Sequence, residues 1–368
     1  MKRIFQLTLI TLLTIVSFNL VGCGKTNDLY ILNWDEYIDE DLITEFEELY
    51  GCNVILDIAQ SNETMFSKIM SDAAPYDIAF PSDYMIGQML LCDEEGVDAP
   101  IIKPIDYTKL ENYKRGNFDP KLMALIDQDC PELNGYFVPY FWGSLGIMYN
   151  TKTLNATQIE TIKTKGWSVL FEKGLLGDVK VGMYASARDS IASSLLYNGF
   201  SLNTKNETEL QKAGDSLFNM NYQAWATDDL KTGVASGKYD LALVYSGDFF
   251  DTLYSVEEDV EFDMVAPSNN NIFFDAMVIP RNSMNEDLAY KFIDFMISYD
   301  NALRNAQYVG YCPTQTAVYQ AMYSDKEYDG IATLPVYYPG NITNGENYKY
   351  LGTQTYELYD LIYKKIKK

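Results

Sequence analysis

The chain that follows the apolar N-terminus alternates short apolar runs with segments of helical periodicity. Leu29 to Leu32, Val54 to Leu56 and Tyr76 to Phe80 are short and continuous, as buried strands are. Between the first two runs, Asp39 to Tyr50 carries apolar residues at helical spacing, namely Leu42, Ile43, Phe46 and Leu49.

Helix boundary signals agree with this pattern. Asp39 can cap the first helix, and Gly51 follows its end. Ser61 opens a second helix that places Met65, Ile69 and Met70 on one side. The order strand, helix, strand, helix, strand predicts a parallel, doubly wound α/β sheet.

The N-terminus has the features of an export signal. Lys2 and Arg3 precede the apolar run Leu7 to Val21, which is short for a membrane-spanning helix. The run ends in Leu20-Val21-Gly22-Cys23, which resembles a bacterial lipobox, and this resemblance implies that Cys23 is diacylated. We therefore expect a signal peptide at 1–22, a lipidated linker at 23–28 and a location on the extracytoplasmic face of the cell membrane, periplasmic in a Gram-negative cell. The alternative is an ordinary signal peptide with an incidental cysteine.

Charge and length narrow the function classes further. The formal net charge of −24, with 52 acidic residues against 28 basic ones, argues against nucleic-acid binding. The chain is too long for one ordinary core, so two lobes are expected.

Cysteine and histidine usage limits the chemistry. Cys52, Cys92, Cys130 and Cys312 lack the spacing of a metal site, and they allow either two disulfides or buried free thiols. The chain has no histidine, which excludes Ser-His-Asp and Cys-His nucleophile pairs and histidine-rich zinc sites. No metal or cofactor is expected, and only carboxylate-based or lysine-based catalysis remains open.

One tetrapeptide carries candidate binding chemistry. Trp34, Asp35, Glu36 and Tyr37 follow the first predicted strand, and ligands of open α/β sheets bind beyond the carboxyl ends of strands. Aromatic faces attract an alkylammonium group and carboxylates fix it, so a cation site is one interpretation. A surface turn with packed rings and solvated acids is the other.

Several segments together resemble a known family. They are Asn33-Trp34 with Glu36-Tyr37, Ser61 to Met65, Tyr76-Asp77 with Pro81-Ser82 and Tyr84, and Pro139-Tyr140 with Trp142-Gly143. In this order they resemble the spermidine/putrescine-binding proteins of bacterial ABC importers, over about Leu29 to Gln315. The resemblance implies a two-lobe, type II periplasmic-binding-protein-like α/β fold with the ligand between the lobes. The expected lobes are 29–138 plus 266–312 and 139–265 plus 313–368.

The same resemblance implies a set of ligand-binding residues. In the first lobe, Trp34, Glu36 and Tyr37 match the family's wall, Asp35 replaces a hydroxyl residue, and Ser82 and Tyr84 match a Pro-Ser-x-Tyr loop.

In the second part of the chain, Asp189 matches the acid of an Ala-Arg-Glu segment, and Ser186 stands where some members carry another carboxylate. Segments that resemble the putrescine-binding members contribute Tyr245 with Asp248 and Phe273 with Asp275, and Tyr311 matches a Gly-Tyr-x-x-Pro region.

The combined prediction is a lipid-anchored, monomeric binding protein that captures putrescine or spermidine and delivers it to an ABC permease without chemistry. Because Ser186 stands where some members carry another carboxylate, we expect a preference for putrescine over spermidine. The alternatives are a related binding protein for another small solute, and a secreted carboxylate-based glycosidase.

Overall fold

The computed structural model describes residues 27–71, 74–255, 260–325 and 331–367. The predicted signal peptide at 1–22 and the predicted lipidation site Cys23 lie outside the described residues. Within the described ranges, none of the helices combines the length and the apolar character that crossing a membrane requires.

The predicted strands and helices at the start of the first lobe are confirmed. Their bounds are β1 (Asp28–Asn33), α1 (Glu40–Tyr50), β2 (Asn53–Ile58), α2 (Asn62–Met70) and β3 (Ile78–Ala79). The sheet order is β2-β1-β3 with parallel pairing throughout, as a doubly wound unit requires. β3 is shorter than the apolar run that predicted it.

The helix boundaries follow from the capping residues that the sequence indicated. The Asp39 carboxylate accepts the backbone N–H of Asp41 at the start of α1, and Gly51 ends the helix with a φ of 60°. The Ser61 hydroxyl accepts the N–H of Thr64 at the start of α2. Only a residue without Cβ adopts the left-handed conformation of Gly51 at little cost.

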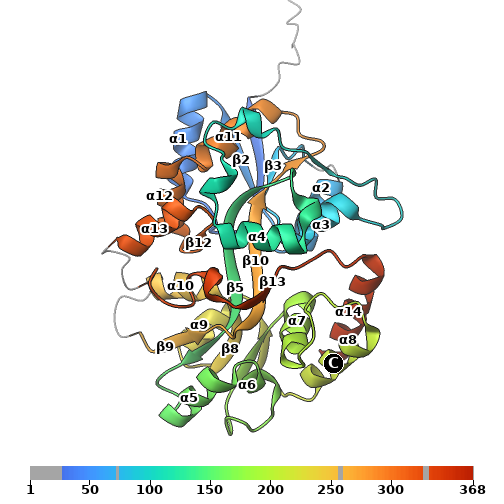
Figure 1. Ribbon diagram of the computed structural model, residues 1–368, viewed down its shortest axis with the longest axis vertical. Helices are drawn as coiled ribbons and strands as arrows, with labels where there is room; N and C mark the ends of the chain where they lie inside the picture. Colours follow the sequence, from blue (N-terminus) through green and yellow to red (C-terminus); the bar gives the residue numbers. More distant parts are fainter. Residues whose placement is uncertain (1–26, 72–73, 256–259, 326–330, 368) are drawn as a thin grey trace, which may run out of the picture.

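Later segments lie with these elements in the upper half of Figure 1. They include three short 3₁₀ helices at Tyr107–Lys109, Arg115–Asn117 and Pro131–Leu133. The remaining elements are α3 (Asp83–Leu91), β4 (Ile102–Lys103), α4 (Pro120–Asp129), β11 (Ile279–Pro280), α11 (Glu286–Met296), α12 (Tyr299–Val309), β12 (Cys312–Pro313) and α13 (Thr316–Ser324).

Two long antiparallel strands connect the lobes. β5 (Val138–Asn150) and β10 (Asn269–Met277) run through both halves of the molecule, with Phe274 opposite Trp142 in their register. Every residue of β5 is buried. The two strands begin close to the predicted lobe boundaries at 138 and 139 and at 265 and 266.

The second lobe is built on the far halves of these strands. Its sheet order is β13-β10-β5-β8-β6-β7, with β9 also paired to β5. A fourth 3₁₀ helix spans Pro339–Asn341. The elements are α5 (Ala156–Lys165), α6 (Ser168–Phe171), β6 (Val181–Tyr184), α7 (Ala187–Tyr197), α8 (Glu207–Phe218), β7 (Ala224–Ala226), α9 (Asp229–Ala235), β8 (Leu241–Tyr245), α10 (Ser246–Ser255), β9 (Phe262–Val265), β13 (Asn344–Glu346) and α14 (Thr353–Ile366).

The last helices divide between the lobes. α13 packs against α12, an element of the predicted first lobe, whereas α14 packs against α7 and α8 in the second lobe. The predicted division at 312 and 313 stays a prediction. The structure has four buried free thiols, at Cys52, Cys92, Cys130 and Cys312. It therefore agrees with the free-thiol alternative and not with the two disulfides.

Candidate functional site

Asp275 lies at the centre of the candidate site, on β10 where the pairing with β5 shifts register. Its carboxylate accepts hydrogen bonds from the Tyr37 hydroxyl at 2.7 Å and from the Ser82 hydroxyl at 2.6 Å. Asn62 fixes Ser82, since it accepts the Ser82 backbone N–H and donates to its hydroxyl oxygen, both at 3.0 Å. The structure thus brings together three of the predicted residues, from three separate segments.

Asp275 is buried without a cationic partner. The residue is only 5% exposed, and no lysine or arginine of the described residues pairs with its carboxylate. Burial raises the pKa of Asp275 to about 6, although the hydrogen bonds from Ser82 and Tyr37 lower it. A carboxylate in this setting is stabilised by any cation that enters.

A series of aromatic rings leads away from Asp275. We call it the ring series, and it runs through Tyr37, Tyr311, Phe273, Tyr245 and Tyr184. Successive centroids lie 5.1, 6.4, 5.0 and 5.2 Å apart, and every pair is edge-to-face. Such rings offer apolar surface for methylene groups and negative faces for cations.

Two glycines allow the ring series to form. A Cβ on Gly143 would lie 2.6 Å from Cζ of Phe273, and a Cβ on Gly247 would lie 1.9 Å from the ring of Tyr311. Both distances are too short for a side chain. Gly143 and Gly247 therefore allow β5 and α10 to approach the rings closely.

Asp248 approaches the rings from α10. It lies in the first helical turn, where the partial positive charge of the helix N-terminus favours a carboxylate, and it accepts the backbone N–H of Tyr245 at 3.3 Å. Burial raises the pKa of Asp248 to about 6, and the charge of Lys231 opposes this shift. The Ser246-Gly247-Asp248 segment is thus the start of a helix and not a turn.

Tyr311 connects the two acids electrostatically. Burial, and then the charge of Asp248, raises the pKa of the Tyr311 hydroxyl, and Asp275 contributes in the same direction. Both carboxylates therefore act on the same ring.

Asp189 is the third buried acid, in the first turn of α7. It is 5% exposed and accepts the hydroxyl hydrogen of Tyr348 at 3.0 Å. Ser186 caps the helix, since its hydroxyl accepts the Asp189 backbone N–H at 3.2 Å. Asp189 also raises the pKa of Tyr245, after the larger effect of burial, which places this acid beside the ring series.

The other predicted residues have different partners. The indole N–H of Trp34 donates to the carbonyl of Phe80 at 2.7 Å, and Asp35 and Glu36 are exposed. Glu36 has a φ of 51° in this turn. The Tyr84 hydroxyl donates to Glu63 at 2.9 Å, and its ring lies 6.1 Å from that of Tyr348. The ligand roles predicted for these residues stay predictions.

Four residues of the site were not predicted from the sequence. They are Asn62, Asp83, Tyr184 and Tyr348. Tyr184 ends strand β6, and its position at a strand end was the available signal. Tyr348 lies in a segment without a motif, and only the folded chain brings it to Asp189.

The fold and the buried acids and rings define a two-lobed extracytoplasmic solute-binding protein. The chain belongs to the bacterial extracellular solute-binding protein family, whose profile matches residues 41–331. Members of this family are solute-binding proteins and not enzymes, so the glycosidase alternative is not supported.

Individual relatives agree with this assignment. The spermidine/putrescine-binding periplasmic protein of Escherichia coli K12 is 28% identical over 348 residues, which cover 93% of this chain and 92% of that protein. A putative spermidine/putrescine ABC transporter structure from Listeria monocytogenes has a TM-score of 0.77 and 33% identity, and covers 93% of this chain and 99% of that one.

A spermidine/putrescine ABC transporter substrate-binding protein from Streptococcus pneumoniae has a TM-score of 0.75 and 30% identity, over 92% of this chain and 98% of the other. These likenesses confirm the predicted two-lobe fold.

Proposed function

We propose that this protein captures a polyamine, putrescine or spermidine, between its lobes and delivers it to an ABC permease. The observation that carries the proposal is Asp275 at one end of the ring series, a buried carboxylate for which the described residues offer no cationic partner, with Asp248 and Asp189 beside the other rings. The names of the relatives described above support the same ligand class.

The chemistry of a polyamine matches this arrangement. Ammonium groups lose hydration in a closed site, which is tolerable only if each one is paired and hydrogen-bonded. Each buried methylene gains about 0.8 kcal/mol, so rings between acids suit an aliphatic diamine. β5 and β10 are the only continuous strands that the described residues show crossing both lobes, and we infer that binding closes the lobes about them.

Titration calorimetry of the mature protein against putrescine, cadaverine, spermidine and spermine tests the proposal. We expect saturable binding of at least one of these amines without turnover. The fold alone serves many solutes, so binding of another small cation or zwitterion in place of all four amines would favour the related-solute alternative.

We further propose that the protein is a monomer anchored through lipid on Cys23. The support is the order of basic residues, apolar run and Leu20-Val21-Gly22-Cys23 in the sequence. One acyl chain gives only marginal membrane binding, so two chains are expected. Cys23→Ala should leave the protein unprocessed or release it from membranes. A variant still acylated and membrane-bound through another residue would contradict the assignment.

A further inference from the structure

Lys231 is a partly buried cation on α9, close to one of the buried acids of the site. Its side chain is only 17% exposed, and its Nζ donates to the Asp251 carboxylate of α10 at 2.6 Å. Helix α9 packs against α10, and both lie in the lower half of Figure 1. Asp251 follows Asp248 by three residues, so the two carboxylates lie on the same face of α10. The ammonium group of Lys231 therefore lies at the face of α10 that carries Asp248.

The stability of α9 does not explain a lysine at this position. The helix begins at Asp229, so Lys231 lies in its first turn, where the partial positive charge of the helix N-terminus disfavours a cation. Burial of the side chain adds a second cost, because the ammonium group loses hydration. Nearby carboxylates must offset both costs.

The acids of α10 provide this compensation. Burial lowers the pKa of Lys231, but the charge of Asp248, followed by the hydrogen bond and charge of Asp251, raises it above its usual value overall. The influence is mutual, since after burial the charge of Lys231 has the largest effect on the pKa of Asp248. The exposed Asp228, just before α9, acts on both groups. Lys231 is thus a resident ammonium group that interacts with the same carboxylate as an entering ligand would.

We propose that Lys231 is a specificity-determining residue, a built-in cation beside Asp248 that disfavours ligands with more than two ammonium groups. Charges of the same sign repel each other, and the total repulsion from one fixed charge grows with the number of ammonium groups on the ligand. Specificity commonly combines such a repulsive element with attractive ones, here Asp248 and Asp275. This inference rests on the proposed polyamine function and adds to it a residue that selects ligand charge.

Lys231→Met tests the effect of the charge. Methionine keeps an unbranched apolar side chain and removes the ammonium group, so spermidine should gain more affinity than putrescine. We expect the ratio of the spermidine and putrescine dissociation constants to fall about tenfold, which corresponds to about 1.4 kcal/mol. Lys231→Arg keeps the charge and should restore the ratio of the wild type. Calorimetry at pH 8 measures the ratio, because Asp248, with a pKa of about 6, is ionised there.

Two further variants separate the charge of Lys231 from its other effects. Lys238→Met is the matched control, because it removes the same charge from an exposed lysine whose Nζ lies over the ring of Tyr239, 5.0 Å from its centroid, before β8 begins. Its ratio should equal that of the wild type. Lys231→Gln keeps a hydrogen-bond donor for Asp251 and loses the charge, so it should behave as Lys231→Met does. A wild-type ratio in Lys231→Gln would overturn the role of the charge.

The outcomes distinguish a failure of this inference from a failure of the proposed function. A wild-type protein that binds none of the amines overturns both. Putrescine binding with the same ratio in Lys231→Met as in the wild type overturns the role of Lys231 and leaves the polyamine function intact. Equal losses of affinity for both amines do the same, because they indicate a structural role. If Lys231→Met fails to fold, as thermal unfolding would show, Lys231→Gln decides.

Discussion

At the scale of single residues, the buried acids differ in what compensates their charge. Asp189 has the Tyr348 hydroxyl and the first turn of α7, and Asp248 has the first turn of α10. Among the described residues, Asp275 has only the hydroxyls of Tyr37 and Ser82, which stabilise a carboxylate less than a cation does. A ligand ammonium should therefore gain most from Asp275.

Asp275→Asn should weaken amine binding by about 2 to 5 kcal/mol, the usual penalty for truncating one side of a buried charge pair. Since the unpaired carboxylate is costly in the unliganded protein, the variant should unfold at the same temperature as the wild type or higher. Calorimetry and thermal unfolding measure the two effects. Asp360→Asn, at an exposed position of α14, is the control. Unchanged affinity with both Asp248 and Asp275 neutralised would place the site elsewhere.

Ser186→Asp tests the basis of the predicted putrescine preference. Aspartate caps a helix as well as serine does, so α7 should persist. The new carboxylate would lie beside Asp189 and should raise the affinity for spermidine relative to that for putrescine. We expect a change of at most about tenfold, which corresponds to about 1.4 kcal/mol. Competition between the two amines measures the shift. A wild type that binds spermidine tenfold more tightly than putrescine would contradict the predicted preference.

At the scale of elements, the sequence predicted those structures whose signals are local. Periodicity and caps located β1, α1, β2 and α2, because the apolar face and the terminal N–H groups of a helix are satisfied by nearby residues. The Ser246-Gly247-Asp248 segment contains a glycine followed by an aspartate, which is a common turn signal, yet it begins α10. The glycine is explained by the ring of Tyr311, which leaves no room for a Cβ at Gly247.

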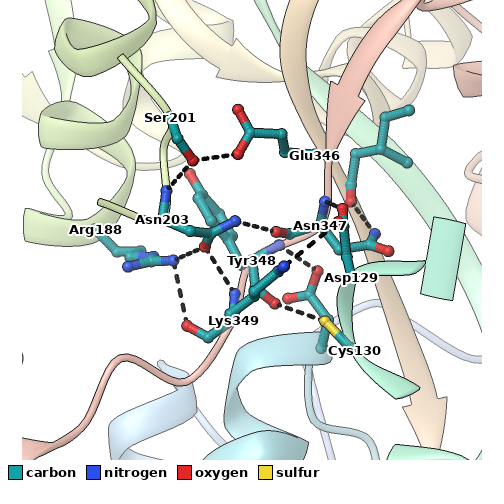
Figure 2. A network of polar contacts seen from close by, with 11 residues as sticks. Asp129, Cys130, Arg188, Ser201, Asn203, Glu346, Asn347, Tyr348 and Lys349 are labelled. Atoms are coloured by element: carbon teal, nitrogen blue, oxygen red, sulfur yellow. Dashed lines mark hydrogen bonds and ion pairs between the residues drawn. The ribbon is translucent and has the colours of Figure 1, made fainter. Parts of the chain in front are cut away.

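The segment from Glu346 to Tyr350, which joins β13 to α14 (Figure 2), escaped prediction for a different reason. Its conformation depends on Asp83, Asp129 and Asn203, which are far away in sequence. The residues of the candidate site could be predicted where they belong to family-matching segments, as Asp275 and Ser82 do. Tyr348 could not, because its role arises from tertiary contacts alone.

The cap of α1 gives a stability prediction at this scale. Asp39 accepts the N–H of Asp41 and pairs with Arg304 at 2.9 Å. Asp39→Ala should lower the free energy of unfolding by about 1 to 2 kcal/mol, because the cap is lost. Asp39→Asn keeps the cap and loses only the charge, so it should cost less. Urea denaturation measures both, and equal costs for the two variants would assign the effect to the ion pair.

At the scale of the whole molecule, the buried carboxylates favour ligand binding but destabilise the folded protein when no ligand is bound. The site lies among residues from both lobes, and in this structure Asp248 and Asp275 are only 9% and 5% exposed. The same desolvation that strengthens a paired ammonium destabilises the unliganded protein. This opposition has a pH signature.

Burial raises the pKa of both Asp248 and Asp275 from 3.8 to about 6. Between these values the folded, unliganded protein binds more protons than the unfolded chain does, so its stability from these groups is present at pH 4 and is lost as the pH rises through 6. The loss is at most about 3 kcal/mol for each acid. Amine binding has the opposite dependence, because it requires the carboxylates, and affinity should fall about tenfold per acid from pH 7 to pH 5.

Calorimetry at pH 6 in buffers of different ionisation enthalpy should therefore show proton release on binding. Asp248→Asn combined with Asp275→Asn should remove the contribution of these two acids to the pH dependence of the unfolding free energy and should abolish tight binding. Asp83, whose pKa burial also raises, would keep its own contribution. An affinity for putrescine that is constant between pH 5 and pH 7 would mean that the ammonium groups are bound by other acids, such as the exposed Asp35 and Glu36, and not by the buried pair.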